Sequence, residues 1–315
     1  MIIAEQLTKR FGARLAIEDV SFRVDRGEVV GFLGPNGAGK TTTLRVLAGV
    51  FPPSSGRALI DGFDVVRAPL AARRRLGYAP ERPALHLEMT VRAQLAFAAA
   101  MKDVTPAATG RRAVDEAIGR TDLGTIVDRR IGTLSKGTRQ RVGIAVALIG
   151  DPPALLLDEP LAGLDPAQGA ETRRLIRTLA SERALLVSSH ALAEVEAMCD
   201  RVVILHRGHV LAAEKPATLA ARLRTSARID VEANAPADAL VRAMSSLAGV
   251  RRVDVLPSSN GHARCRIEAD PERDLRAELA RCITAEGWGL LSLQPVETSL
   301  EEAFLAVVGT PERPA

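Results

Sequence analysis

The chain has 315 residues, 47% of them hydrophobic, a length that allows one large core or a core domain with a smaller one. Its formal net charge of +4 weakly favours contact with anionic lipid or nucleic acid, although a solvated, arginine-rich surface accounts for it more simply. Three widely spaced cysteines without a CxxC pair argue against a zinc site and fit a reducing cytosol. We expect neither a signal sequence nor a membrane span, because no apolar run approaches about 18 residues.

The first two thirds of the chain alternate strand patterns with helix patterns. Residues 1–66 are expected to form short strands and turns around one glycine-rich loop, with a strand over 28–34 and a helix over 41–50. The pattern then becomes helical over about 83–150, with helices predicted at 91–102, 111–120 and 138–149. Strands return at 154–160 and 184–190, followed by a helix over 191–199 and a hairpin over 201–211 that turns at Arg207 and Gly208.

The remainder of the chain has a pattern of its own. Strands are predicted at 228–233, 251–256, 263–269 and 289–295, with helices at 237–247 and 272–287. This βαββαβ order is typical of a separate, small α+β domain, which we place over 226–309. Its last element is a predicted helix that Ser299 caps at the start and Gly309 ends, and residues 310–315 form a tail.

A phosphate-binding loop lies between the first buried strand and the helix that follows it. The sequence GPNGAGKT at 34–41 matches the pattern GxxxxGK[ST] in full, and its strand-before, helix-after context distinguishes it from a chance glycine-rich turn. Backbone N–H groups and the helix N-terminus can cradle phosphates there, with Lys40 reaching the β- and γ-phosphates and Thr41 binding Mg²⁺. The predicted nucleotide-binding residues of this segment are Gly34, Pro35, Asn36, Gly37, Ala38, Gly39, Lys40, Thr41 and Thr42.

A second polar feature follows a run of buried-strand residues in the sequence ALLLDEP. Asp158 and Glu159 stand at the end of this strand, which Pro160 terminates because proline cannot donate to a ladder. An acidic pair on a solvated loop is the alternative interpretation. Downstream of a complete phosphate loop, we predict instead that Asp158 holds Mg²⁺ and that Glu159 orients and polarises the attacking water.

A second glycine-bearing helix start, LSKGTRQR at 134–141, precedes this acidic strand. Together, and in this order, the three motifs resemble those of the nucleotide-binding subunits of ABC transporters, and the resemblance covers about residues 1–215. It implies an α/β fold of the P-loop NTPase class over residues 1–218, with an antiparallel β part and a helical subdomain at about 83–150. The small α+β domain follows this core.

The resemblance also implies roles for single residues. Phe11 occupies the position of an aromatic residue that stacks on adenine, although packing in the core is its alternative role. Ser135 and Gly137 match the family signature LSGGQ, whereas Lys136 and Thr138 depart from it. Asp165 matches a family residue at the seam of a dimer, and His190 matches a histidine that senses the γ-phosphate.

One departure affects the expected mechanism. Glu81 in the sequence LGYAPER occupies the position of the family's loop glutamine. A carboxylate there can approach Mg²⁺ or water, but it cannot donate a hydrogen bond as an amide does. We therefore predict a role for Glu81 in catalysis or metal binding that differs from that of the family residue.

The resemblance implies ATP and Mg²⁺ as cofactors. It also implies a homodimer, or a pair with another ABC ATPase subunit, in which the signature of one chain covers the ATP of the other. The stretch 299–305 resembles the end of ABC-2-type exporter ATPases, which act with a separate transmembrane permease subunit. We therefore expect an ATPase located in the cytoplasm, on the membrane face through its permease, and no nucleic-acid partner.

Two other functions remain open at this point. An ATPase acting on ribosomes or nucleic acid usually carries two cassettes or a long coiled coil, and neither is visible here. An importer ATPase usually carries a strand-rich, barrel-like tail, which differs from the predicted βαββαβ order.

Overall fold

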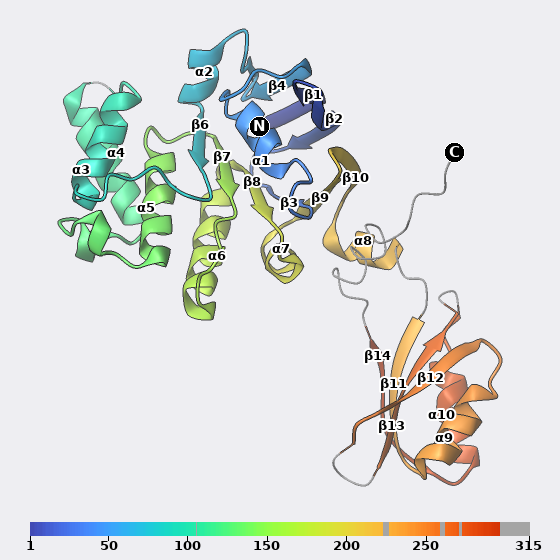
Figure 1. Cartoon of the computed structure of the whole chain (residues 1–315). Coiled ribbons are helices and arrows are strands. Elements are labelled where there is room, and N and C mark those ends of the chain that lie inside the picture. The colour runs from blue at the N-terminus through green and yellow to red at the C-terminus, as the bar shows by residue number, and fades with distance from the viewer. Residues whose placement is uncertain (105, 223–226, 259–261, 271–272, 297–315) are drawn as a thin grey trace. The chain divides into compact units, whose positions relative to one another are not determined.

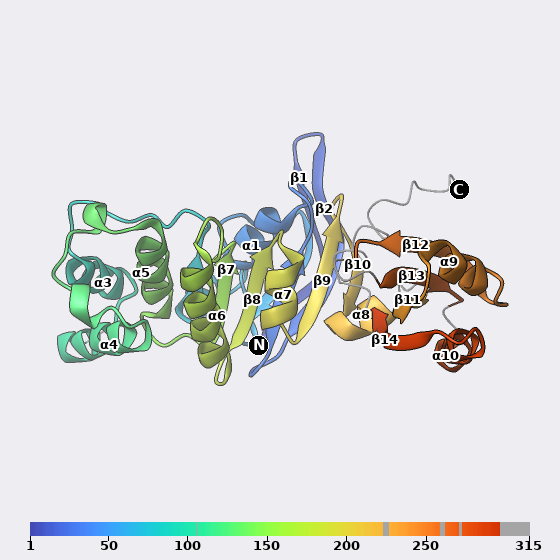
Figure 2. The same ribbon diagram turned by 90° about the horizontal axis from the view of Figure 1, so that it is seen from below.

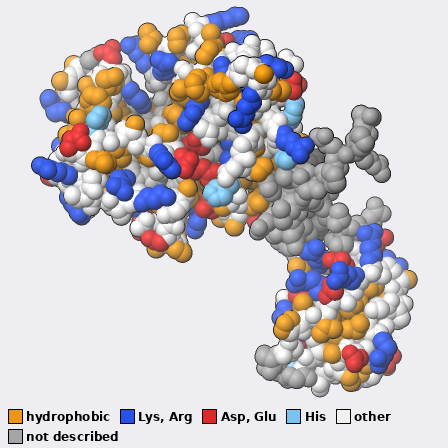
Figure 3. All heavy atoms as spheres, viewed as in Figure 1, with side chains coloured by type: hydrophobic (Ala, Val, Ile, Leu, Met, Phe, Trp, Pro, Cys, Tyr) orange, Lys and Arg blue, Asp and Glu red, His pale blue; other side chains and the backbone are white. Residues whose placement is uncertain are grey.

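The computed structural model describes residues 1–104, 106–222, 227–258, 262–270 and 273–296. It divides into two compact units, Met1–Pro216 and Ala217–Ala315, which are described separately below. The helix predicted over 299–309 and the tail lie outside the described residues. On the face drawn in Figure 3, Lys and Arg side chains of the first unit are spread among acidic and apolar ones.

The first unit begins with an antiparallel sheet in the order β2-β1-β4-β5. The expected short strands are in fact a long hairpin at their start, since β1 and β2 have 10 and 11 residues. Buried residues alternate with more exposed ones at the start of β1 and at the end of β2, as a sheet with one covered face requires, and register shifts interrupt the pattern between them. The strands are β1 Ile2–Phe11, β2 Arg14–Val24, β4 Ser55–Ile60 and β5 Phe63–Asp64.

A second, six-stranded sheet has the order β10-β9-β3-β8-β7-β6, in which β10 is antiparallel and the others are parallel. Every residue of β3, β7 and β8 is buried, which explains their continuous apolar sequences. The predicted hairpin at residues 201–211 is confirmed as β9 and β10. The strands are β3 Val29–Leu33, β6 Leu76–Ala79, β7 Ala154–Asp158, β8 Ala184–Ser189, β9 Arg201–His206 and β10 His209–Glu214.

Helices and the first sheet cover the two faces of this second sheet. The helices α1 (Lys40–Leu47) and α2 (Pro69–Arg74) share an apolar core with the first sheet and with one face of the second (Figure 1). The helices α6 (Pro166–Ala180) and α7 (Leu192–Met198) lie on the opposite face (Figure 2). The parallel strands are therefore buried from both sides, and their carboxyl ends lie at one edge.

The predicted helical insertion is confirmed beside this sheet. It contains α3 (Val91–Met101), α4 (Ala107–Arg120) and α5 (Lys136–Leu148), which contact one another, and two short 3₁₀ turns, Gly124–Ile126 and Ile131–Thr133. Thr90 caps α3, and Ser135 caps α5 by accepting a hydrogen bond from the backbone N–H of Thr138. The insertion thus fixes the position at which the signature helix α5 begins.

The second unit begins with α8 (Pro216–Arg222), which starts at its border, and continues in the predicted βαββαβ order. An antiparallel sheet in the order β12-β13-β11-β14 packs on two helices, and Trp288 is partly buried against their shared core. Its elements are β11 Ala227–Asn234, α9 Ala237–Ser245, β12 Val250–Leu256, β13 Ala263–Ala269, α10 Arg276–Ala285 and β14 Gly289–Val296.

Candidate nucleotide site

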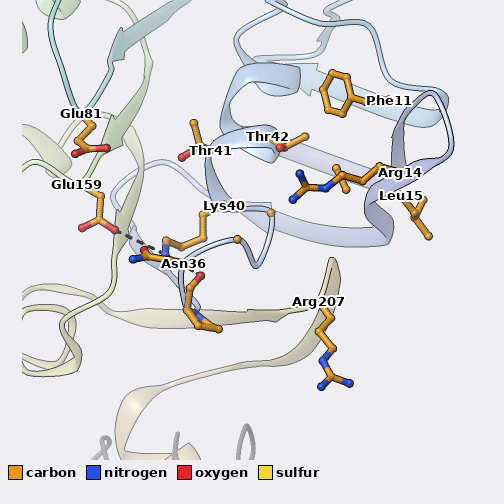
Figure 4. A pocket seen from close by; sticks show the side chains of 14 residues that line it. Phe11, Arg14, Leu15, Asn36, Lys40, Thr41, Thr42, Glu81, Glu159 and Arg207 are labelled. Carbon is orange, nitrogen blue, oxygen red and sulfur yellow. Dashed lines mark hydrogen bonds and ion pairs between the residues drawn. The ribbon is translucent and has the colours of Figure 1, made fainter.

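A cavity of about 520 Å³ opens between the β1–β2 hairpin and the carboxyl ends of the second sheet (Figure 4). Figure 4 shows Phe11 and Arg14 on one side of it, Glu81 and Glu159 on the other, and Lys40 between them. The cavity is lined by Phe11, Arg14, Leu15, Ala16, Pro35, Asn36, Gly37, Gly39, Lys40, Thr41, Thr42, Glu81, Glu159 and Arg207. Most of the predicted phosphate loop therefore faces one common space.

Glycine is required in this loop by both conformation and space. Gly37 and Gly39 have φ angles of 82° and 109°, in the left-handed region that side chains disfavour. A Cβ atom on Gly39 would lie 2.6 Å from Cγ2 of Ile17 and 2.8 Å from the carbonyl oxygen of Ala16. The loop consequently lies close to β2 before α1 begins at Lys40, and the N-terminus of α1 faces the cavity.

Two predicted loop residues are tied into the surrounding fold rather than lining the cavity. The carbonyl oxygen of Gly34 accepts a hydrogen bond from Nζ of Lys40 at 2.5 Å. Ala38 is buried, and its carbonyl oxygen accepts a hydrogen bond from the backbone N–H of Gly208 in the β9–β10 turn. These contacts hold the loop in shape around the space that its other residues line.

Lys40 is a buried cation at the floor of this cavity. It is 7% exposed, and its Nζ lies 3.7 Å from Oε1 of Glu159. Burial lowers the pKa of Lys40, and the charge of Glu159 acts in the opposite direction. The charge of Asp158 also raises this pKa, and a buried ammonium group at a cavity floor is suited to bind an anionic ligand that enters the cavity.

Two carboxylates stand at the end of β7 in different surroundings. Asp158 is 2% exposed and accepts a hydrogen bond of 2.6 Å from Oγ of Ser188. Burial raises the pKa of the Asp158 carboxyl; the hydroxyls of Ser188 and Thr41 lower it, and the charges of Glu159 and Glu81 raise it further. Asp158 is thus held inside the sheet edge, behind the residues that line the cavity.

Glu159 turns out of the strand toward the cavity. Its φ angle is 49°, and Oε2 of its carboxylate lies 2.8 Å from Nδ1 of His190, which follows β8. The two predicted catalytic residues therefore meet from neighbouring parallel strands. Glu81, the third of that group, is exposed and lines the same cavity after β6.

Phe11 lies at the exposed mouth of the cavity rather than in the core. It is 43% exposed and makes an edge contact with Phe51 at a ring-centroid distance of 5.4 Å, with Nζ of Lys9 5.1 Å from the Phe11 centroid. Its ring therefore offers apolar surface to a ligand in the cavity.

The signature residues are placed elsewhere. Among the described residues that line the cavity there is none from α5 or α6, so Ser135, Gly137 and Asp165 do not contribute to it. A Cβ atom on Gly137 would lie 2.8 Å from Cδ of Gln168, which shows that the start of α5 lies against the start of α6. Asp165 caps α6 by accepting a hydrogen bond from the backbone N–H of Gln168.

Comparison with known proteins identifies the family. The family model described as ABC transporter matches residues 17–162. Over 312 residues, which are 98% of each chain, the sequence is 31% identical to the linearmycin resistance ATP-binding protein LnrL of Bacillus subtilis (strain 168). The chain belongs to the ATP-binding subunits of ABC transporters.

Two more relatives extend this ABC assignment. The bacitracin transport ATP-binding protein BcrA of Bacillus licheniformis is 38% identical over 213 residues, 67% of this chain and 68% of that protein. A dimeric structure of the ATP-binding cassette MJ0796 in a post-hydrolysis state with ADP and Pi is 25% identical, with a TM-score of 0.61, over 68% of this chain and 98% of that one. The ABC subunit binds and hydrolyses ATP as part of a transporter, and cassettes of this family act as dimers with a membrane permease.

The donor set of the ABC site fits Mg²⁺ bound together with ATP. The described residues contain no group of three or more His, Cys, Asp or Glu able to hold a metal by themselves. Mg²⁺ commonly takes one or two carboxylate oxygens together with substrate phosphates and waters. The hydroxyl of Thr41, which lines the cavity, and the buried carboxylate of Asp158 behind it are oxygen donors of that kind.

Sequence reasoning missed several residues of this ABC site. Arg14, the first residue of β2, and Arg207, in the β9–β10 turn, line the cavity, and Arg14 points toward the phosphate loop in Figure 4. Ser188 contacts both members of the acidic pair. A signal for Ser188 existed, because two polar residues end the apolar strand 184–189 at the same sheet edge as Asp158.

Within the described ranges, every helix of the ABC subunit is too short or too polar to cross a bilayer.

Proposed function

We propose that this chain powers an exporter by hydrolysing ATP at the cavity of its first unit, with Glu159 as the general base. The observation that carries this proposal is the position of the Glu159 carboxylate. It lies at the end of a parallel strand, on the cavity wall, between the buried ammonium of Lys40 and the imidazole of His190. A carboxylate held in this way can accept a proton from a water molecule beside the phosphates.

The residues around Glu159 bind the phosphates, the adenine ring and Mg²⁺. Lys40 neutralises phosphate charge, and His190 orients the Glu159 carboxylate through its Nδ1 contact. Phe11 stacks on the adenine ring at the mouth of the cavity. Thr41 and Asp158 hold Mg²⁺, which neutralises phosphate charge when bound, and Glu81 approaches the same region from β6.

The described lining of the cavity lacks the signature residues. We infer that Ser135 and Gly137 bind the γ-phosphate held by the phosphate loop of a second copy of this chain, with Asp165 at the seam. The capped N-terminus of α5 supports this, because such a terminus favours anions. MJ0796, whose cassette forms a dimer in its structure, is the fold-level precedent.

The exporter assignment rests on two relatives, of which one matches more than the cassette. The match to LnrL runs through both units, and BcrA is named for bacitracin transport. We propose that residues 1–218 form the ATPase domain, that 226–309 form a domain common to this exporter type, and that a separate permease holds the chain on the cytoplasmic face of the membrane. Relatives that are transporter subunits do not favour the ribosome or nucleic-acid alternative. Recovery of the tagged chain with a polytopic membrane protein would support the assignment, and recovery with ribosomes would contradict it.

The base assignment is tested with Glu159→Gln in the full-length chain. The amide keeps the shape of the side chain but cannot accept the proton, so turnover should fall by about 10²–10⁴-fold while ATP binding persists. The matched control is Glu194→Gln, a glutamate on α7 that accepts a hydrogen bond from Ser189 outside the cavity lining. ATP hydrolysis at near wild-type rate by Glu159→Gln would show that another group is the base.

A further inference from the structure

Ser188 lies directly beside the acidic pair on the neighbouring strand. In the parallel pairing of β7 with β8, Asp158 and Ser188 are register partners, and Ser188 is 0% exposed. Its Oγ donates a hydrogen bond to Oδ1 of Asp158 at 2.6 Å and accepts one from the backbone N–H of Glu159 at 2.9 Å. A single hydroxyl therefore connects the side chain of one carboxylate residue with the backbone of the next.

The backbone that Ser188 binds is strained. A glutamate with a φ angle of 49° is in the left-handed region, which costs of order 1–3 kcal/mol and persists only where neighbouring groups hold it. The N–H of this residue points into the sheet edge, where a polar group needs a partner. A serine hydroxyl carries one donor and two acceptor positions, so it can satisfy this N–H while it donates to Asp158.

The end of β8 thus controls Glu159 at two points. Ser188 binds its backbone, and His190, two residues further on, binds its carboxylate. Ser189 lies between them but serves a different purpose, since its Oγ donates to Oε2 of Glu194 and accepts from the backbone N–H of Ala191. Two adjacent buried serines therefore offer a test residue and a matched control.

We propose that Ser188 is a positioning residue for ATP hydrolysis: it holds the peptide of Glu159 in the conformation that directs the base into the cavity. The inference rests on the proposed role of Glu159 as the base. Without the hydroxyl, the N–H of Glu159 loses its partner and the left-handed conformation loses a restraint. The base then samples other directions, while the phosphate loop that binds ATP is unchanged.

The test measures kcat and KM of the full-length chain with Ser188→Ala and with Ser189→Ala. Ser188→Ala should lower kcat by about tenfold, the scale of one lost hydrogen bond, and leave KM within about twofold. Ser189→Ala should keep kcat within about twofold. Equal losses in the two variants, or a loss confined to KM, would overturn the proposal.

A double variant of Ser188→Ala with Glu159→Gln tests the positioning role of Ser188 separately from the role of Glu159 as the base. If Ser188 acts by placing the base, Ser188→Ala should cause no further loss of kcat in the Glu159→Gln background. A full additional tenfold loss there would overturn the positioning role. If Glu159→Gln by itself retains wild-type turnover, the base assignment fails, whatever Ser188→Ala does.

Two further variants distinguish hydrogen bonding from packing. Ser188→Thr keeps the hydroxyl and should retain more of the wild-type kcat than Ser188→Ala. Ser188→Cys fills similar space with a weak donor and should lose about as much kcat as Ser188→Ala. Should Ser188→Ala fail to fold, Ser188→Cys decides the question, because wild-type kcat in that variant would overturn the proposal.

Discussion

The two units of this chain differ in what their backbones and cores contain. Among the described residues, every non-glycine residue with a positive φ angle lies in the first unit: Gln6, Asp19, Asp61, Asp103, Asp122, Asp151, Glu159 and Arg207. The buried polar and charged side chains of the described ranges also lie there, with Lys40, Asp158 and Ser188 among them. The core of the second unit is instead built from aliphatic, cysteine and methionine side chains.

This difference shows where function constrains the sequence. Strained backbone and buried charge each cost free energy, so they persist where other contacts or chemistry compensate for them. In the first unit two of the strained residues, Glu159 and Arg207, line the nucleotide cavity. The second unit follows a simpler rule in its two central strands, β11 and β13, where alternate residues are buried in the core that the sheet shares with two helices.

The largest contrast is expected between glycines with positive φ angles in the two units. Gly39→Ala adds a Cβ atom within 2.8 Å of the carbonyl oxygen of Ala16, so the phosphate loop must move and ATP affinity should fall by about a hundredfold. Gly287→Ala in the second unit meets no atom within 4 Å and should cost only about 1 kcal/mol of stability. Titration with ATP and thermal melting measure both. Comparable ATP affinities in the two variants would show that Gly39 matters no more to ATP binding than Gly287.

A smaller effect is expected at the mouth of the cavity. Phe11→Ala should weaken ATP binding by about tenfold, since stacking on a base is worth roughly 1–3 kcal/mol. Phe97→Ala is the matched control, because Phe97 is 42% exposed against 43% for Phe11 and makes a similar edge contact, with His86, outside the cavity lining. If the two substitutions change ATP affinity equally, Phe11 has no special contact with the base.

The smallest effect is expected from removal of the second unit. Its core residues form a cluster separate from the core of the first unit, so a chain that ends after residue 224 should fold and bind ATP within about twofold of the full chain. Calorimetry and ATP titration check this. Insolubility or non-cooperative melting of the shortened chain would show that the second unit completes the first.

Local patterns predicted much of this architecture. The phosphate loop, the three helices of the insertion and the βαββαβ order each depend on residues close in sequence. The helix α6 was missed, although Asp165 at its N-cap and Pro166 at its first position signal a helix start. Such signals are short and easily hidden between stronger motifs.

The alignment of neighbouring strands in the sheet could not be predicted from the sequence. The contact of Ser188 with Asp158 joins residues 30 positions apart and depends on β7 and β8 pairing in one particular alignment. Arg14 and Arg207 reach the cavity from the start of β2 and from the β9–β10 turn rather than through any motif. The relation that we propose between the signature and the phosphate loop of a second chain was implied by the family resemblance, and the fold of one chain does not contain it.

The claim that ATP lies between two copies of this chain is tested most directly by mixing two inactive variants. Ser135→Arg blocks the signature and spares the phosphate loop, whereas Lys40→Ala damages the loop and spares the signature. Each variant alone has a lesion at both sites of its homodimer, but their heterodimer contains one site with an intact loop and an intact signature. We expect mixing to restore ATP-dependent dimerisation. If each signature served its own chain's ATP, every site in the mixture would still carry a lesion, and dimerisation would remain absent with both chains folded.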